Sequence, residues 1–275
     1  MKLRRMLSIL IVLCVVLPLV PVAVNAEEIA SGTCGDNLSW VLTDDGTLII
    51  SGEGAMTDYR GWEDYKVQIA KVVIDEGVTS ICDYAFYGCG SLHSITISNT
   101  VSNIGYAAFC YCSSLSSINT PIGLTCISDF AFYGCGSLTS IGIPDSVTSI
   151  GEAAFYECSK LTSISIPDGV TSIADYTFYN CFSLTSIDIP NSVTNIGYAA
   201  LYNCVSLSSI VLPDGITSIG EYAFFACTSV TSITVPNCVV NIGCCTFQNC
   251  RSLTSITLPD GIINIGYLAF YGCFN

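Results

Sequence analysis

The chain has 275 residues, of which 51% are hydrophobic and 11% charged, and its 8 Lys and Arg against 22 Asp and Glu give a net charge of −14. A surface this acidic repels phosphate backbones and anionic lipids, so nucleic acid and peripheral membrane binding are disfavoured. His93 is the single histidine of the chain, which argues against most Ser/His/Asp, Cys/His and multi-histidine zinc sites.

The first 26 residues have the pattern of a targeting segment. A short basic stretch over 1–5 precedes an almost wholly apolar run over 6–24, and small residues at 24–26 offer a cleavage position. An uncleaved anchor is the alternative, because the apolar run is nearly long enough to span a bilayer. Two prolines in the run and the small triplet favour cleavage. We predict a signal peptide over 1–26, a secreted or cell-surface location, and no membrane span after cleavage.

Residues 27–68 lie before the periodic part of the chain. The segments 38–42 and 47–51 read as strands, and an Asp-Gly pair between them is typical of a tight hairpin turn. An atypical terminal unit of this kind covers the open end of a repeat array. We therefore predict an N-terminal β-hairpin cap over 27–68, with Trp40 or Trp62 on the seam with the first repeat.

From residue 69 to residue 275 the chain repeats every 23 residues. Phenylalanine stands three residues before each periodic cysteine, with Leu201 as the exception, and isoleucine rows continue without change from Ile95 to Ile256 and from Ile81 to Ile265. Several rows that stay in phase over nine periods exclude chance and predict a solenoid. The periodic cysteines are at positions 89, 112, 135, 158, 181, 204, 227, 250 and 273.

Each repeat contains the same succession of short elements. Apolar and polar side chains alternate over the last residues of 161–166, which predicts a short strand with one buried face. A Pro-Asp-Gly turn at 167–169 ends this strand, and 170–173 is a second extended piece. Over 175–181 we expect one or two helical turns, with phenylalanine and cysteine on the inner face. The predicted fold class is an α/β repeat solenoid, a leucine-rich repeat stack of about nine 23-residue units with short parallel strands and short helical turns.

The spacing of the periodic cysteines favours a packing role over disulfide formation or metal binding. Stacked strands place equivalent atoms about 4.8 Å apart, whereas the Cβ atoms of a disulfide lie about 3.8 Å apart, and a straight row of thiols does not converge on zinc. We expect small buried side chains, no metal site and no cofactor. Some of the remaining cysteines of the exported chain could pair after export; these are Cys34, Cys82, Cys110, Cys126, Cys238, Cys244 and Cys245.

Two outward-facing rows are candidate ligand sites. Aligned tyrosines can stack on sugar rings or hold a protein, or they can pack on each other. A variable strand row can carry specificity or can drift freely as an exposed face. The tyrosine row is Tyr87, Tyr133, Tyr156, Tyr179, Tyr202, Phe225 and Tyr271. The strand row is Thr96, Asn119, Gly142, Ser165, Asp188, Val211, Thr234 and Thr257.

The repeat L-T-S-I-x-I-P-D-x-V-T-S-I-G-x-x-A-F-x-x-C resembles the BspA-like (Treponema-type) subclass of leucine-rich repeats, over residues 69–275. Local departures are Thr120 in place of an apolar strand residue, an irregular turn at 119–122, and Leu201 in place of phenylalanine. The resemblance implies a bacterial surface protein with an adhesion-like role.

Two functions remain open at this stage. One is a secreted or cell-surface binding module that recognises an extracellular protein or glycan without catalysis. The other is a structural envelope or matrix protein that assembles through its own ends. A glycan-processing enzyme would need a close acid/base pair, whereas the acidic residues of the repeats occupy turn and helix-start positions, so we expect no enzymatic activity.

The last repeat raises the possibility of self-association. Apolar side chains of this repeat would face water on one side, and its strand would offer unpaired backbone groups, which invites pairing with another chain. We therefore predict that the chain either forms a homodimer through the C-terminal end or frays in its last repeat, with a two-fold end-to-end dimer favoured. The side chains concerned are Ile256, Leu258, Ile262, Ile265 and Phe270.

Overall fold

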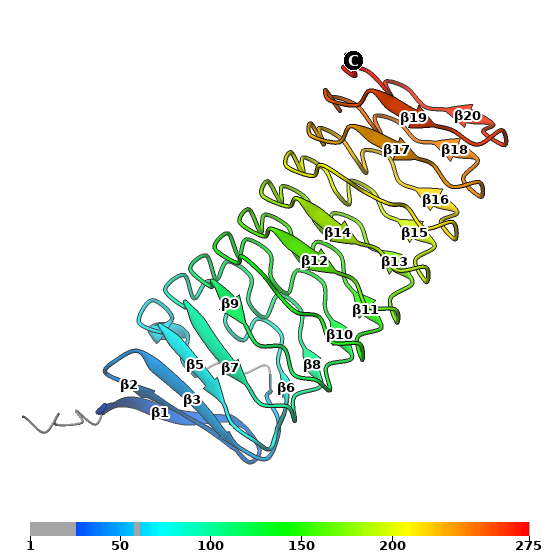
Figure 1. Ribbon diagram of the computed structural model, residues 1–275. Coiled ribbons are helices and arrows are strands. Elements are labelled where there is room, and N and C mark those ends of the chain that lie inside the picture. The colour runs from blue at the N-terminus through cyan, green and yellow to red at the C-terminus, as the bar shows by residue number, and fades with distance from the viewer. Residues whose placement is uncertain (1–25, 58–60, 275) are drawn as a thin grey trace, which may run out of the picture.

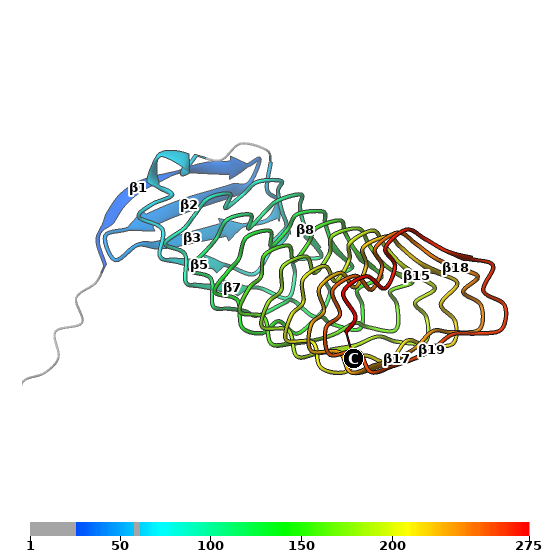
Figure 2. The ribbon, with the colours of Figure 1, turned by 90° about the horizontal axis from the view of Figure 1, so that it is seen from above.

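The computed structural model describes residues 26–57 and 61–274. Figure 1 shows an elongated stack of coils, each one turn of a solenoid, with the N-terminal strands at one end and the C-terminal strands at the other. Seen from above, successive coils repeat one outline (Figure 2). The predicted signal peptide falls almost wholly on residues 1–25, outside the described part of the chain. Within that part, no helix is long and apolar enough to cross a membrane.

The N-terminal unit is a three-stranded antiparallel meander. Its strands are β1 (Glu28–Gly35), β2 (Leu38–Thr43) and β3 (Thr47–Gly52), and β2 and β3 form the expected hairpin. Gly46 has a φ of 79°, as the turn of this hairpin requires. On its other side β3 pairs in parallel with β5 (Lys71–Ile74). The sheet of the cap therefore runs directly into the sheet of the repeats.

Two rows of short strands run along the stack (Figure 1). They pair in parallel at an offset of one repeat, so that Ile164 lies beside Ile187 and Ile173 beside Ile196. The first row is β5, β7 (Ser94–Ile97), β9 (Ser117–Ile118), β12 (Ser163–Ser165), β14 (Ser186–Asp188), β17 (Ser232–Thr234) and β19 (Ser255–Thr257). The second row is β4 (Gly54–Ala55), β6 (Val78–Ile81), β8 (Asn103–Ile104), β10 (Cys126–Ile127), β11 (Ser149–Ile150), β13 (Ser172–Ile173), β15 (Asn195–Ile196), β16 (Ser218–Ile219), β18 (Asn241–Ile242) and β20 (Asn264–Ile265).

The third side of each coil consists of consecutive β-turns, so the predicted helical turns are wrong. The amide of Phe132 donates to the carbonyl oxygen of Ala154 in the next coil at 2.9 Å, while the amide of Tyr133 closes a turn on Phe130 at 3.1 Å. Phe130 has a φ of 58°, which a continuous α-helix does not permit. Because alternate amides bond between coils, they are not available for the i to i−4 bonds of a helix. The one helix in the described residues is the 3-10 helix η1 (Glu63–Tyr65).

A stack of phenylalanine rings fills the core beneath these turns. The centroids of neighbouring rings lie 5.2 to 5.6 Å apart, and the stack is interrupted where Leu201 stands in the row. Trp62 continues the stack onto the cap, since its ring packs against Phe86 at 5.8 Å. Trp40 packs edge-on against Trp62 at 5.9 Å. Both tryptophans therefore lie on the predicted seam.

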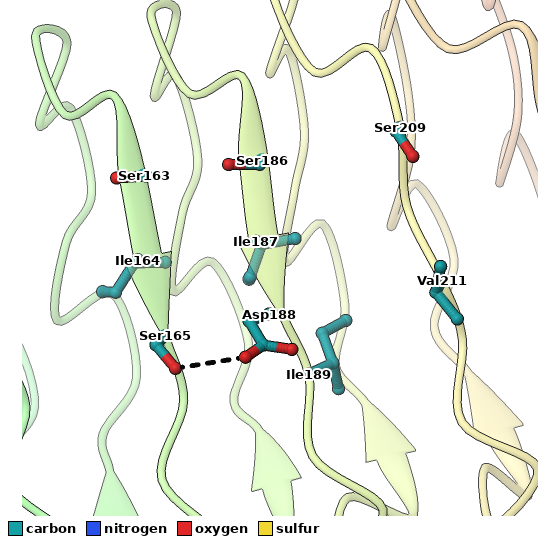
Figure 3. A pocket seen from close by; sticks show the side chains of 9 residues that line it. All are labelled: Ser163, Ile164, Ser165, Ser186, Ile187, Asp188, Ile189, Ser209 and Val211. Atoms are coloured by element: carbon teal, nitrogen blue, oxygen red, sulfur yellow. Dashed lines mark hydrogen bonds between the residues drawn. The ribbon is translucent and has the colours of Figure 1, made fainter.

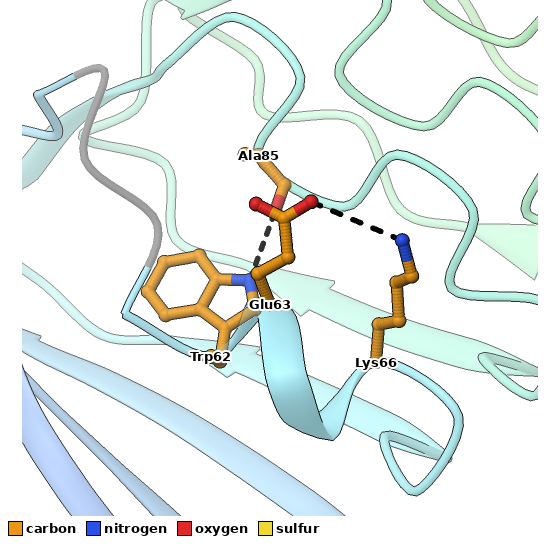
Figure 4. A network of polar contacts seen from close by, with 4 residues as sticks. All are labelled: Trp62, Glu63, Lys66 and Ala85. Atoms are coloured by element: carbon orange, nitrogen blue, oxygen red, sulfur yellow. Dashed lines mark hydrogen bonds and ion pairs between the residues drawn. The ribbon is translucent and has the colours of Figure 1, made fainter.

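Trp62 also joins the cap to the first repeat through a polar contact. Its indole Nε1 donates to the carbonyl oxygen of Ala85 at 2.8 Å in a buried position (Figure 4). Beside it, Lys66 and Glu63 form an exposed ion pair at 3.9 Å, which contributes little to stability. The buried indole bond is the contact that fixes the orientation of the ring.

The cysteine row forms a ladder of thiol hydrogen bonds. Each thiol from Cys112 to Cys273 donates to the main-chain carbonyl oxygen of the residue 26 positions earlier, as Cys158 does to Phe132 and Cys227 does to Leu201. The Sγ–O distances of the eight bonds lie between 3.1 and 3.3 Å. The row is buried apart from the partly exposed Cys273, and the described cysteines are free thiols. The cysteines therefore join each coil to the preceding one.

One prediction concerns a close approach between coils. The carboxylate Oδ1 of Asp175 accepts from the amide of Tyr198 at 2.7 Å, and a Cβ added to Gly197 would lie 2.6 Å from the amide nitrogen of Asp175. We expect Gly197→Ala to lower the free energy of unfolding by about 1–3 kcal/mol, because backbone must move to make room. Gly142→Ala is the matched control, since its Cβ meets open space. Equal unfolding free energies for the two variants in urea would contradict this account.

A second prediction follows from the buried thiols. Burial raises the pKa of Cys158, Cys204 and Cys227 well above the ordinary value of 9.0, and that of Cys250 to about 12. Above pH 9.0 these thiols ionise in the unfolded chain but stay protonated in the folded one, so each removes about 1.4 kcal/mol of stability per pH unit. We expect the urea midpoint to fall steeply between about pH 9 and pH 11, and less steeply for Cys158→Ala. A midpoint that is independent of pH would disprove this.

Candidate functional site

The tyrosine row lies on the turn side of the stack, and its rings pack on each other. Tyr133, Tyr156, Tyr179, Tyr202 and Phe225 form a continuous face-to-face stack with centroids 4.4 to 4.5 Å apart and planes within 10°. Burial raises the pKa of several of these hydroxyls. Each inner ring has both faces covered by its neighbours. A sugar ring therefore cannot stack on the faces within this row.

The ends of the tyrosine row differ from its centre. Tyr87 meets Tyr111 edge-on at 5.9 Å, and Tyr111 meets Tyr133 edge-on at 5.3 Å. Tyr271 stands in the last coil and is 61% exposed, and Gln248 occupies the position of the row in the coil before it. The structure thus does not place the whole predicted row in one continuous surface.

A second aromatic row beside the first was missed from the sequence. Tyr84 contacts Tyr106 at 5.2 Å, and Tyr176 contacts Tyr198 at 5.2 Å, in edge-on arrangements. The row alternates between two adjacent sequence positions in successive coils, so it does not appear as a single 23-residue period. A comparison of repeats two coils apart would have shown it.

The strand row does not lie on the turn side with the tyrosine row. It lies on an exposed parallel sheet. Thr96 is on β7, Ser165 on β12, Asp188 on β14, Thr234 on β17 and Thr257 on β19, and all five are exposed. The structure places Ser165 beside Asp188, with the serine hydroxyl donating to Asp188 Oδ2 at 3.4 Å (Figure 3). Thr234 and Thr257 are register partners. Thr96 belongs to a separate part of the sheet.

The first row of strands is interrupted in two coils. No strand forms over 139–143 or 208–212, so within the described residues this row divides into three sheets. In the first interruption, the hydroxyl of Thr120 donates to the carbonyl oxygen of Gly142. Asn119 uses its side-chain amide to bond both the amide and the carbonyl of Ile97. One side-chain bond thus takes the place of part of the strand pairing here, while the amides of residues 140–143 make no backbone hydrogen bond to the described coils.

The second interruption leaves main-chain groups without partners. In this row the amide of Ile166 donates to Asp188 and that of Val235 to Thr257, at 3.0 and 2.9 Å. The equivalent amide of Leu212 has no such partner, and the described coils on either side make no backbone hydrogen bond to Ser209–Leu212. The coil before this interruption contains Leu201, where the phenylalanine stack is broken. Leu201, a departure from the repeat that the sequence shows, is therefore also followed by a loss of strand pairing.

Hollows open on both sides of residues 208–212. The larger one, of about 420 Å³, lies against β12 and β14, and the other, of about 320 Å³, lies towards β17. Figure 3 shows the serine side chains and Asp188 on the strands beside the larger hollow, with Val211 on the unpaired segment. The larger hollow is lined by Ser163, Ile164, Ser165, Ser186, Ile187, Asp188, Ile189, Ser209 and Val211.

Three carboxylates give this area a negative charge. Asp145, Asp168 and Asp188 line an adjoining hollow of about 400 Å³ that shares Ser165, Asp188 and Ile189 with the larger one. Among the described residues, the Asp188 carboxylate accepts one hydrogen bond, from Ser165 to Oδ2, so its other oxygen is available. Within the described residues, no three His, Cys, Asp or Glu side chains are arranged to hold a metal ion.

The apolar side chains of the last coil lie partly in water. Ile256, Leu258, Ile262 and Phe270 are partly buried against the core, and Ile265 is 50% exposed. These are the residues that the sequence analysis placed at the end of the stack.

The fold and this surface define a parallel β-solenoid of 23-residue repeats with an exposed, interrupted strand face. Residues 64–181 and 148–275 match the family described as BspA type leucine rich repeat region, in 6 copies. The chain therefore belongs to the BspA-type leucine-rich repeat proteins, as the sequence resemblance implied. A search of curated proteins finds no match.

Several solved structures are similar to this chain. One is a leucine-rich repeat protein from Eubacterium ventriosum, with 23% identity over 90% of this chain and 96% of that chain, and a TM-score of 0.46. A leucine-rich repeat protein from Treponema pallidum shows 26% identity over 88% of each chain, with a TM-score of 0.41. A third, from Bacteroides ovatus, shows 25% identity over 88% of this chain and 92% of that chain, with a TM-score of 0.43.

Proposed function

We propose that this protein is a secreted or cell-surface binding module that recognises an extracellular protein or glycan through its strand face. The observation that carries the proposal is the interruption over 208–212, which opens two hollows and leaves main-chain groups unpaired on an exposed sheet. Exposed main-chain groups without a protein partner can hydrogen-bond to a ligand that replaces the water on them. The strand row around the interruption also differs from coil to coil, as a recognition surface requires.

The tyrosine row is the weaker candidate for the binding surface. Its inner rings cover each other's faces at 4.4 to 4.5 Å, so a ligand meets only ring edges and hydroxyls. Stacked aromatic pairs contribute about 0.5–1.5 kcal/mol each beyond their buried area. The alignment of these rings is thus explained by the stability that their stacking adds on the turn side of the stack.

Catalysis is not part of the proposed function. Hydrolysis of a glycosidic bond uses one carboxylic acid held protonated by an apolar environment and a second carboxylate at a set distance. Asp145, Asp168 and Asp188 are all exposed, and none has the apolar surroundings of a general acid. Passive recognition is the activity that this arrangement supports.

The proposal is tested by binding of the purified protein to a panel of glycans and matrix proteins. Asp188→Ala combined with Val211→Glu should weaken binding of the ligand found by at least about tenfold, since both side chains line the larger hollow. Thr257→Ala, in the same row on β19, is the control and should bind normally. Circular dichroism should be unchanged in both variants.

A triple change of Tyr133, Tyr156 and Tyr179 to Ser distinguishes the two surfaces. It should lower the unfolding midpoint and leave affinity within about twofold, because it removes stacking and not the hollow. If the triple variant loses binding while the strand-face variant keeps it, the tyrosine row is the site and the proposal is wrong.

A further inference from the structure

The unpaired segment Ser209–Leu212 suggests which kind of ligand the strand face takes. We infer that the two hollows beside it bind a neutral oligosaccharide, whose hydroxyl groups enter the gaps and bond to main-chain groups and serine side chains. This inference rests on the proposed function and narrows it to one chemical class. It is carried by the anchoring of the coil next to the interruption, the side chains that line the hollows and the charge around them.

The anchoring of coil 208–212 to its neighbours favours hydroxyl groups over a peptide strand as its ligand. Coil 208–212 is held to its neighbours close to the interruption, because the amide of Ser208 donates to Thr185 at 3.3 Å and Ser218 is the register partner of Asn195. A strand inserted between two coils at the usual spacing would need them to move apart by about 4.8 Å. A hydroxyl group is close in size to water and can bridge two main-chain groups in a narrower gap. The anchored coil therefore admits hydroxyls and excludes a whole strand.

The lining of the hollows suits a sugar ring. Ser163, Ser186 and Ser209 present hydroxyls that both donate and accept, and Asp188 has a free oxygen that accepts from ligand hydroxyls. Val211 is 76% exposed and offers an apolar patch to the C–H face of the ring. A few polar groups around an apolar patch are the usual composition of a small-ligand site.

The charge of the surface disfavours an anionic ligand. Asp145, Asp168 and Asp188 line hollows that adjoin each other, in a chain of net charge −14. Uronate, sulfate and phosphate groups are repelled by such a surface. Successive coils lie about 4.8 Å apart, close to the length that one sugar residue adds to an extended chain. Neighbouring residues of one oligosaccharide can therefore occupy the two hollows beside residues 208–212.

The experiment is isothermal titration calorimetry of the purified protein with chemically defined probes. The neutral probes are cello-, manno- and chito-oligosaccharides, the anionic probe is oligogalacturonate, and the cationic probe is oligolysine. We expect a neutral probe to bind and the anionic probe not to bind. Ser209→Tyr, which fills the hollows from the unpaired segment, should weaken that binding at least about tenfold. Ser255→Tyr, in the same row on β19, should change it less than about twofold.

The outcomes separate this inference from the proposed function. Absence of binding by every neutral probe, or equal affinity in the Ser209→Tyr variant, overturns the inference. Binding of oligolysine that is lost in Asp188→Ala also overturns it, in favour of a basic peptide, and leaves the binding function intact. If strand-face substitutions change the binding of neither the oligosaccharide probes nor the matrix proteins, then the inference and the proposed function are both wrong. Unfolding midpoints of the two tyrosine variants, each at an exposed serine, show whether the fold is retained.

Discussion

Hydrogen bonding between successive coils is the interaction on which this structure depends. A single 23-residue coil has few internal partners for its amides and carbonyls, and the neighbouring coils supply them. On the turn side, alternate amides reach the next coil. Thiols and threonine hydroxyls add side-chain bonds of the same kind, as Thr162 shows by donating to Thr139 at 3.2 Å. Buried polar groups left unpaired would cost more than the bonds contribute, so the repeat length has little freedom to vary.

The same dependence explains where the molecule can acquire a binding surface. A change inside one coil is transmitted to the next because the two share their hydrogen bonds. The irregular turn at 119–122 is followed by lost pairing over 139–143, and Leu201 is followed by lost pairing over 208–212. Both interruptions leave main-chain groups without backbone partners among the described residues, and two hollows flank the second one. Irregularity in a regular array thus creates the local surface on which the proposed recognition rests.

The sequence predicts the periodic features well because they repeat in phase. The parallel strands, the inward phenylalanine and cysteine rows, the hairpin and the tryptophan seam all follow from spacing and alternation. The helical turns over segments such as 175–181 were wrong because their amides bond to the next coil, a competition that a single repeat does not reveal. For the tyrosine row, the sequence left two alternatives open, binding of a ligand and packing of the rings on each other, and the structure shows the packing. The hollows beside Val211 were not predictable, because they arise from hydrogen bonds that fail to form.

Native-state hydrogen exchange at matched positions tests the central claim most directly. Ile166, Leu212 and Val235 occupy the same position of their repeats, but only the amides of Ile166 and Val235 are bonded to the next coil. The account predicts that these two amides exchange slowly, through large openings of the stack, and that the amide of Leu212 exchanges at least about a hundredfold faster. Equal protection of all three amides would contradict the claim that pairing between coils is interrupted at 208–212.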